Sequence, residues 1–248
     1  MGATMSILRF DAHILLRDNF LTVVAGLTGL ILVAFAAVGV FRDTLGVSHF
    51  QPWIAYVLIM FLITNVSTYG MLFGLVFVEE VETRVRAALM TTPAPPAYLT
   101  LLRTLSVFIW LIVQPFVFAA LASAAWGATP LRAWQWGVLC AALAPLGAVF
   151  MTVLSTVAAN RVEALAMGKF FSIATAPPML LYLLPPDAWY RHLFLIFPTT
   201  PAVKAFEALR AGASGVATAW VLWGVVYAVI LLVWAVRRHI RRSYKISA

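Results

Sequence analysis

Long apolar runs alternate with short polar segments along the whole chain. Six of the runs are long enough to cross a membrane: Phe20 to Phe41, Trp53 to Val78, Leu101 to Ala125, Trp134 to Ala158, Leu165 to Leu184 and Ala217 to Val236. A hydrocarbon core about 30 Å thick needs roughly 20 residues of α-helix. Backbone polar groups must be hydrogen-bonded inside lipid, and the runs lack the alternation of barrel strands. The pattern therefore predicts an all-α membrane protein with six transmembrane helices.

Two segments outside these runs have their own apolar patterns. Residues 6–19 carry apolar side chains at helical spacing and predict an amphipathic helix on the inner membrane surface. Residues 185–216 contain an apolar stretch that is too short to span, followed by the helix breakers Pro198 and Pro201. We expect two short re-entrant helices here, in or on the outer leaflet.

A third polar segment, residues 79–98, lies between the second and third predicted spans. Its glutamates precede arginines by four residues, at Glu80–Arg84 and Glu82–Arg86, which is the favourable order on a helix. The segment predicts a short amphipathic helix on the cytoplasmic side. No linker is long enough to separate a second folding unit, so residues 1–248 are predicted to form a single membrane domain.

Composition and charge support a membrane protein and give it an orientation. The chain is 63% hydrophobic and 10% charged, whereas soluble domains carry about 25% charged residues. With both termini in the cytoplasm, most Lys and Arg residues fall on the inner side, as expected from the positive-inside rule. The basic residues left outside are Arg42, Arg132, Arg191, Lys204 and Arg210. The net charge of +8 and the basic tail RRHIRRSYK then indicate contact with anionic lipid, not with nucleic acid.

The sequence has few of the patterns that carry chemistry. Its one Gly-Lys pair, Gly168-Lys169, lacks the rest of a phosphate-binding loop, so ATP hydrolysis is not expected in this chain. No Asp, Glu or His is expected near the middle of a span, which disfavours a proton relay. The single cysteine, Cys140, excludes an internal disulfide and a thiolate metal cluster. We expect no catalytic residue, metal or cofactor in this chain.

Neutral polar side chains remain inside the spans. Each one alone is typical of helix–helix hydrogen bonding, worth roughly 0.6 kcal/mol. Together, Asn65, Thr68 and Gln114 are interpreted as the lining of a weakly polar transport path. Such a path favours a hydrophobic or amphiphilic substrate, a drug or a lipid. Gly70 and Gly74, four residues apart, predict close helix packing.

Two other functions remain open from the residues alone. One is a self-sufficient carrier or channel. The other is an intramembrane protease, because Gly212 to Gly215 spells the GxSG pattern of rhomboid proteases. A catalytic serine needs a histidine within hydrogen-bond reach, and the predicted last span contains none.

The cytoplasmic segment resembles a loop of bacterial ATP-binding-cassette type-2 exporter permeases. That loop carries an acidic cluster, a leucine and a Thr-Pro pair, matched here by Glu80, Glu82, Leu89, Thr92 and Pro93. The stretches RFDAHILLRDNF, ANRVEALAMGKF and LPPDAWYRHLFLIFPTTPAVKAF resemble the family's first helix, its loop between spans four and five, and its outer re-entrant segment. The chain is most similar to small drug-export permeases, including those implicated in fluoroquinolone export.

The resemblance implies a function and partners. It implies a permease in the bacterial plasma membrane that exports its substrate together with a second permease chain, identical or related. Separate nucleotide-binding subunits would bind ATP and magnesium and hydrolyse the ATP. The residues implied to contact that ATPase subunit are Glu79, Glu80, Glu82, Arg84, Arg86, Leu89, Thr92, Pro93, Arg9 and Arg17.

Overall fold

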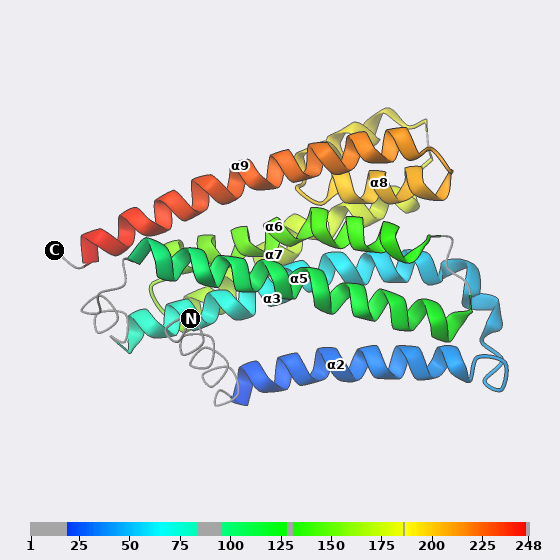
Figure 1. The fold of residues 1–248 in the computed structure, drawn as a ribbon, viewed down its shortest axis with the longest axis horizontal. Helices are drawn as coiled ribbons and strands as arrows, with labels where there is room; N and C mark the ends of the chain where they lie inside the picture. Colours follow the sequence, from blue (N-terminus) through cyan, green and yellow to red (C-terminus); the bar gives the residue numbers. More distant parts are fainter. Residues whose placement is uncertain (1–18, 84–95, 128–130, 186, 247–248) are drawn as a thin grey trace. The chain divides into compact units, whose positions relative to one another are not determined.

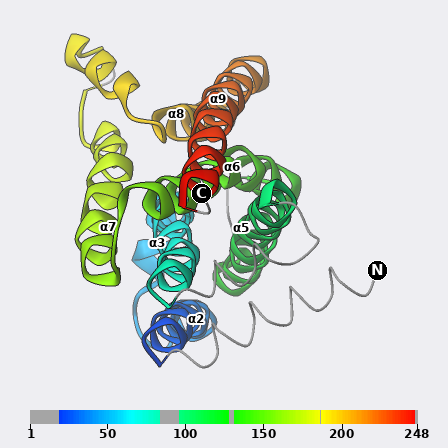
Figure 2. The ribbon, with the colours of Figure 1, turned by 90° about the vertical axis from the view of Figure 1, so that its left-hand side faces the viewer.

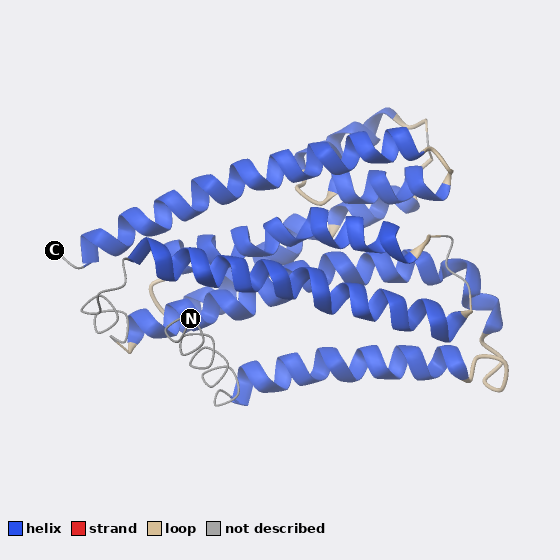
Figure 3. Ribbon diagram, in the orientation of Figure 1, coloured by secondary structure: helices blue, strands red, loops and turns tan. Residues whose placement is uncertain are grey.

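The computed structural model describes residues 19–83, 96–127, 131–185 and 187–246. Every regular element within these ranges is a helix (Figure 3). The all-α prediction is therefore confirmed for the described residues. The helix expected over residues 6–19 lies almost wholly outside them.

The chain divides into two compact units. The first comprises residues 1–54 and 120–129, and the second comprises residues 55–119 and 130–248. The first contains α2 (Asn19–Val40), the 3₁₀ helix η1 (Ser48–Trp53) and the end of α5 (Pro96–Trp126).

Hydrogen bonds join the ends of α2 and α5 within the first unit. Arg42 Nη1 donates to the carbonyl oxygens of Ala125, at 2.9 Å, and Gly39, at 3.3 Å. Trp126 Nε1 donates to the carbonyl of Phe35 at 3.1 Å. The last carbonyls of a helix lack intrahelical donors and carry partial negative charge, so a guanidinium is well placed there.

The second unit contains the remaining helices. They are the first part of α5, α3 (Ile54–Glu82), α6 (Ala133–Val157), α7 (Arg161–Thr175), η2 (Pro177–Tyr182), η3 (Trp189–Ile196), α8 (Thr200–Arg210) and α9 (Ser214–Ile246). α6 is buried along most of its length. α9 runs beside it, and α8 lies beside the beginning of α9 (Figures 1 and 2).

The predicted close packing at Gly70 and Gly74 is present between α3 and α6. A Cβ added at Gly70 would lie 2.7 Å from the carbonyl oxygen of Gly147, and one at Gly74 would lie 2.8 Å from a methyl carbon of Leu154. Real Cβ atoms do not approach so closely, so larger residues would push the two helices apart. The glycines thus hold α3 against the most buried helix of the unit.

Five segments are long and apolar enough to cross a membrane: Ser48–Glu80, Thr100–Trp126, Ala133–Val157, Arg161–Tyr182 and Ser214–Arg241. The first apolar run corresponds to α2. Within α2, the segment Gly26–Val40 is apolar but shorter than the five others. The chain is a helical membrane protein, and six spans remain a prediction.

Two elements differ from the sequence pattern in detail. The fifth run changes from an α-helix to a 3₁₀ helix after Thr175, because Pro177 and Pro178 have no amide hydrogen to continue the α-helical pattern. The helix of the sixth run continues past its apolar residues to Ile246. The two short helices expected in residues 185–216 are present as η3 and α8, and their placement in the outer leaflet stays a prediction.

Candidate functional site

The three glutamates of the predicted coupling segment lie in the last turn of α3. Glu79, Glu80 and Glu82 continue the helix of the second apolar run, so they do not begin a separate helix. Glu80 is buried, with 3% of its surface exposed, whereas Glu82 is exposed. Thr83 Oγ1 donates to the carbonyl of Glu79 at 2.8 Å. We call this end of α3, with the turn it contacts, the glutamate end.

Glu82 bonds directly to the start of α7. Its Oε1 accepts the backbone N–H of Arg161 at 2.9 Å. In the same turn, Asn160 Oδ1 accepts the N–H of Glu163 at 2.8 Å, and Glu163 Oε2 accepts the N–H of Ala159 at 2.8 Å. Asparagine is a preferred N-cap, and carboxylates are favourable at the positive end of the helix dipole. Glu82 therefore joins the end of α3 to the start of α7.

A buried histidine links α3, α6 and α9 near the same end. His239 of α9 is 1% exposed, and its Nδ1 lies 2.8 Å from Ser155 Oγ of α6. Phe77 of α3 packs edge-on against the imidazole, with ring centroids 5.3 Å apart. No pattern in the sequence indicates this contact, because the apolar run of α9 ends before His239 and the two hydrogen-bonded residues are 84 positions apart.

Most hydroxyl groups within the spans bond to their own helix. Ser67, Thr104, Thr152 and Thr175 each donate to a carbonyl three or four residues earlier. Such back-bonding satisfies the hydroxyl locally. These residues therefore need no partner from another helix or from a ligand.

The two buried amides among the predicted path residues differ from these hydroxyls. Asn65 is 2% exposed, and its Nδ2 donates to the carbonyl of Phe61 at 2.9 Å. Its Oδ1 is buried without a hydrogen-bond partner among the described residues, as are Oε1 and Nε2 of Gln114. Thr68, the third predicted path residue, is half-buried.

Ring contacts set the register between α3 and α5 at this point. Phe61 packs on Phe118 with centroids 4.3 Å apart, and Tyr69 packs on Trp110 at 6.0 Å. From Phe61 to Tyr69 the residue number on α3 rises by eight, while the number of the contacted residue on α5 falls by eight. The two helices are therefore antiparallel. Asn65 is four residues from each α3 ring, and Gln114 is four residues from each α5 ring. The two amides therefore lie at the same level, which we call the amide layer.

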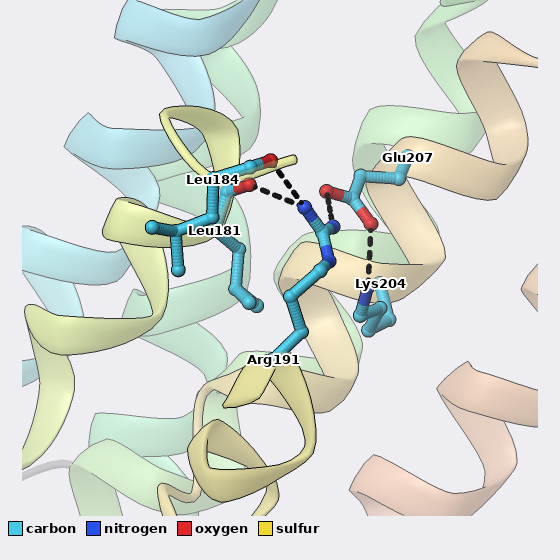
Figure 4. A network of polar contacts seen from close by, with 5 residues as sticks. All are labelled: Leu181, Leu184, Arg191, Lys204 and Glu207. Atoms are coloured by element: carbon cyan, nitrogen blue, oxygen red, sulfur yellow. Dashed lines mark hydrogen bonds and ion pairs between the residues drawn. The ribbon is translucent and has the colours of Figure 1, made fainter. Parts of the chain in front are cut away.

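A network around Arg191 occupies the opposite end of α6 (Figure 4). Arg191 is 8% exposed, and its Nη1 donates to the carbonyls of Leu181 at 2.8 Å and Leu184 at 2.9 Å. Its Nη2 lies 2.9 Å from Glu207 Oε1, while Lys204 Nζ lies 3.0 Å from Glu207 Oε2. We call these contacts the arginine network. It fixes η2, η3 and α8 to one another.

Aromatic rings extend this network toward α3 and α6. Phe206 of α8 is fully buried and contacts Tyr56, Tyr182 and Trp136, with centroids 5.8 to 6.0 Å apart. The guanidinium of Arg210 lies 4.3 Å from the centroid of Tyr56. Sequence reasoning missed this assembly, since Arg191 and Glu207 lie on either side of two prolines and share no helical periodicity.

Comparison with protein families decides the class of the chain. Residues 11–236 match the family described as Fluoroquinolones export permease protein Rv2686c-like. The chain belongs to this export permease family. The matched residues include the glutamate end, the amide layer and the arginine network, whereas His239 lies beyond them. A comparison with curated proteins gives no match.

The remaining predicted coupling residues of this permease lie outside the described residues. They are Arg84, Arg86, Leu89, Thr92, Pro93, Arg9 and Arg17. The helix expected across residues 79–98 is thus described only for its first glutamates and from Pro96 onward, and its role in coupling stays a prediction.

The GxSG pattern of this permease does not bring its serine to the buried histidine of α9. Ser214 is the first residue of α9 and is exposed, and its carbonyl accepts the hydroxyl of Thr218. His239 lies 25 residues further along the same helix, roughly 37 Å away at 1.5 Å per residue. A nucleophile and its base must be within hydrogen-bond distance, so this serine and this histidine do not form a catalytic pair.

Proposed function

We propose that the chain is the membrane subunit of an ATP-driven exporter. It moves a hydrophobic or amphiphilic drug out of the bacterial cell, and a separate subunit binds magnesium and hydrolyses ATP. A second permease chain, identical or related, completes the pathway. Both termini and the glutamate end face the cytoplasm. Membership of an export permease family supports the transport role, and the missing phosphate-binding loop in this sequence supports a separate ATPase.

The observation that carries the coupling proposal is the bond from Glu82 to the start of α7. A partner that moves the end of α3 also moves α7 through Glu82 and the N–H of Arg161. Burial of His239 between Phe77 and Ser155 extends the same movement to α6 and α9. An ATPase subunit that moves the glutamate end would therefore move α3, α6, α7 and α9 together.

The test is charge reversal at this end. The Glu80→Lys/Glu82→Lys double variant and the Glu82→Lys single variant, which keeps the buried Glu80, are purified with a tag on the permease. We expect the wild-type chain to retain an ATPase subunit during purification and both variants to retain at least tenfold less of that subunit. An ATPase surface with positive charge opposite the glutamates would repel the introduced lysines. Drug efflux from cells is expected to fall in parallel.

Asp43→Lys is the matched control, because Asp43 is an exposed acid in the turn after α2. We expect it to leave ATPase retention and efflux unchanged. Normal retention and normal efflux in the Glu82→Lys variant, at wild-type membrane levels, would refute the coupling proposal.

A further inference from the structure

The amide layer holds three of the buried side-chain polar atoms that have no hydrogen-bond partner among the described residues. Burying an amide without a hydrogen bond destabilises a fold, because the group loses its bonds to water and gains none. Three amide atoms at one level are in that state, namely Asn65 Oδ1 and both terminal atoms of Gln114. Elsewhere in the described spans, hydroxyls such as those of Ser67 and Thr104 are satisfied within one turn.

Backbone chemistry adds a further acceptor at this level. Pro115 lies inside α5, directly after Gln114. It has no N–H, so it cannot donate to the carbonyl of Leu111, which is its normal α-helical acceptor. The Leu111 side chain is occupied by packing, because a Cβ added at Gly147 of α6 would collide with it. The layer therefore combines donors and acceptors from side chains with an acceptor from the backbone.

Aromatic rings bound the layer along the helix axes. The pair Phe61–Phe118 lies one turn to one side, and the pair Tyr69–Trp110 lies one turn to the other, each about 6 Å away at 1.5 Å per residue. Trp110 is 45% exposed, whereas Phe118 and Tyr69 are buried. The layer thus has aromatic walls on both sides and reaches the surface of the unit at Trp110.

We propose that the amide layer is the drug-binding site of this permease. The ligand is a flat aromatic molecule that carries both a hydrogen-bond acceptor, such as a carbonyl or carboxylate oxygen, and a donor. Gln114 Nε2 donates to the ligand's acceptor, while Asn65 Oδ1 and Gln114 Oε1 accept from its donor. Ring contacts with the flanking aromatic pairs position the flat part of the molecule. This inference rests on the proposed export function and names its substrate site.

Neutral amides suit this role better than charged residues do. A charged side chain in the middle of a span is costly to insert into the membrane, whereas a neutral amide binds polar ligand groups at a lower insertion cost. A site built to hydrogen-bond its ligand also rejects analogues that lack the bonding group. The layer therefore discriminates polar aromatic drugs from plain hydrocarbons of the same size.

The experiment measures binding in the absence of ATP. A fluorescent fluoroquinolone, norfloxacin, is titrated into purified permease in detergent, and its fluorescence anisotropy reports binding. We expect Gln114→Leu to weaken binding about tenfold and Asn65→Leu/Gln114→Leu to weaken it further, because each lost hydrogen bond accounts for up to about tenfold. The Ser67→Ala control, which removes a buried hydroxyl satisfied by its own helix, is expected to bind like the wild type.

Thermal unfolding of the same samples separates a binding role from a structural one. Replacing the two amides by leucine removes three unpartnered buried atoms and one hydrogen bond, from Asn65 Nδ2 to Phe61, so the unfolding temperature should change little. Gln114→Asn restores an amide in a smaller side chain, and we expect it to recover part of the lost affinity. Wild-type affinity in the double leucine variant, or a large fall in its unfolding temperature, would overturn the assignment.

The outcome is independent of the ATPase question. If the leucine variants lose norfloxacin binding but the permease transports without an ATPase subunit, the proposed function is wrong and the binding site stands. If the leucine variants bind norfloxacin as the wild type does and the permease couples to an ATPase subunit, only the assignment of the binding site is wrong.

Discussion

The arginine network and the glutamate end occupy opposite ends of α6, and they hold charged groups in different ways. At the arginine network, a buried guanidinium bonds to two carbonyls and a carboxylate, and a lysine shares that carboxylate. At the glutamate end, the exposed carboxylate of Glu82 accepts the backbone N–H of Arg161, the first residue of α7. One end is fixed by a buried arginine and a partly exposed carboxylate, and the other by an exposed hydrogen bond.

This difference indicates where the molecule can rearrange. Removing a buried side chain that makes charge-assisted hydrogen bonds costs about 1.5–3 kcal/mol, whereas the contacts of exposed charged side chains contribute roughly 0–1 kcal/mol. The arginine network should therefore persist through a transport cycle. The exposed contact of Glu82 can exchange at little cost, as the proposed docking of an ATPase subunit requires.

The largest effect is expected at the arginine network. Arg191→Ala removes the buried cation that bonds to Glu207 and to two carbonyls, while Glu207 keeps Lys204, so we expect the free energy of unfolding to fall by about 1.5–3 kcal/mol. Unfolding in detergent micelles measures this loss. Arg237→Ala removes an exposed arginine of α9 and serves as the control. A loss below about 1 kcal/mol would show that the network is not a fixed structural element.

The smallest effect on stability is expected at the glutamate end. Glu82→Gln keeps an acceptor for the N–H of Arg161 and removes only an exposed charge, so the free energy of unfolding should change by less than about 1 kcal/mol. Efflux should nevertheless decrease, because the charge available to a docked ATPase is lost. A stability loss as large as that of Arg191→Ala, measured under the same conditions, would remove the contrast between the two ends.

Sequence reasoning reached the features that depend on residues close together along the chain. Apolar runs predicted the helices, the Gly70 and Gly74 spacing predicted the α3–α6 contact, and Pro198 and Pro201 marked the break before α8. Asn65 and Gln114 are identifiable as candidate path residues because they are polar within apolar runs. Their common level was not predictable, because it depends on the register of α3 against α5.

Features that join distant segments were beyond the sequence pattern. Arg191 was counted only as an outer positive charge, although it is buried against residues on both sides of it in the chain. His239 was placed beyond the last span, yet α9 continues and buries it against Ser155. In both cases a polar residue is stabilised by a specific partner, and periodicity carries no information about that partner.

Uphill transport by the purified protein tests the central claim most directly. Permease is reconstituted into liposomes with or without its copurified ATPase subunit, and accumulation of norfloxacin against a gradient is followed after addition of ATP and magnesium. The account predicts accumulation only when both subunits and ATP are present. Accumulation driven by the permease alone, without the ATPase subunit, would contradict it.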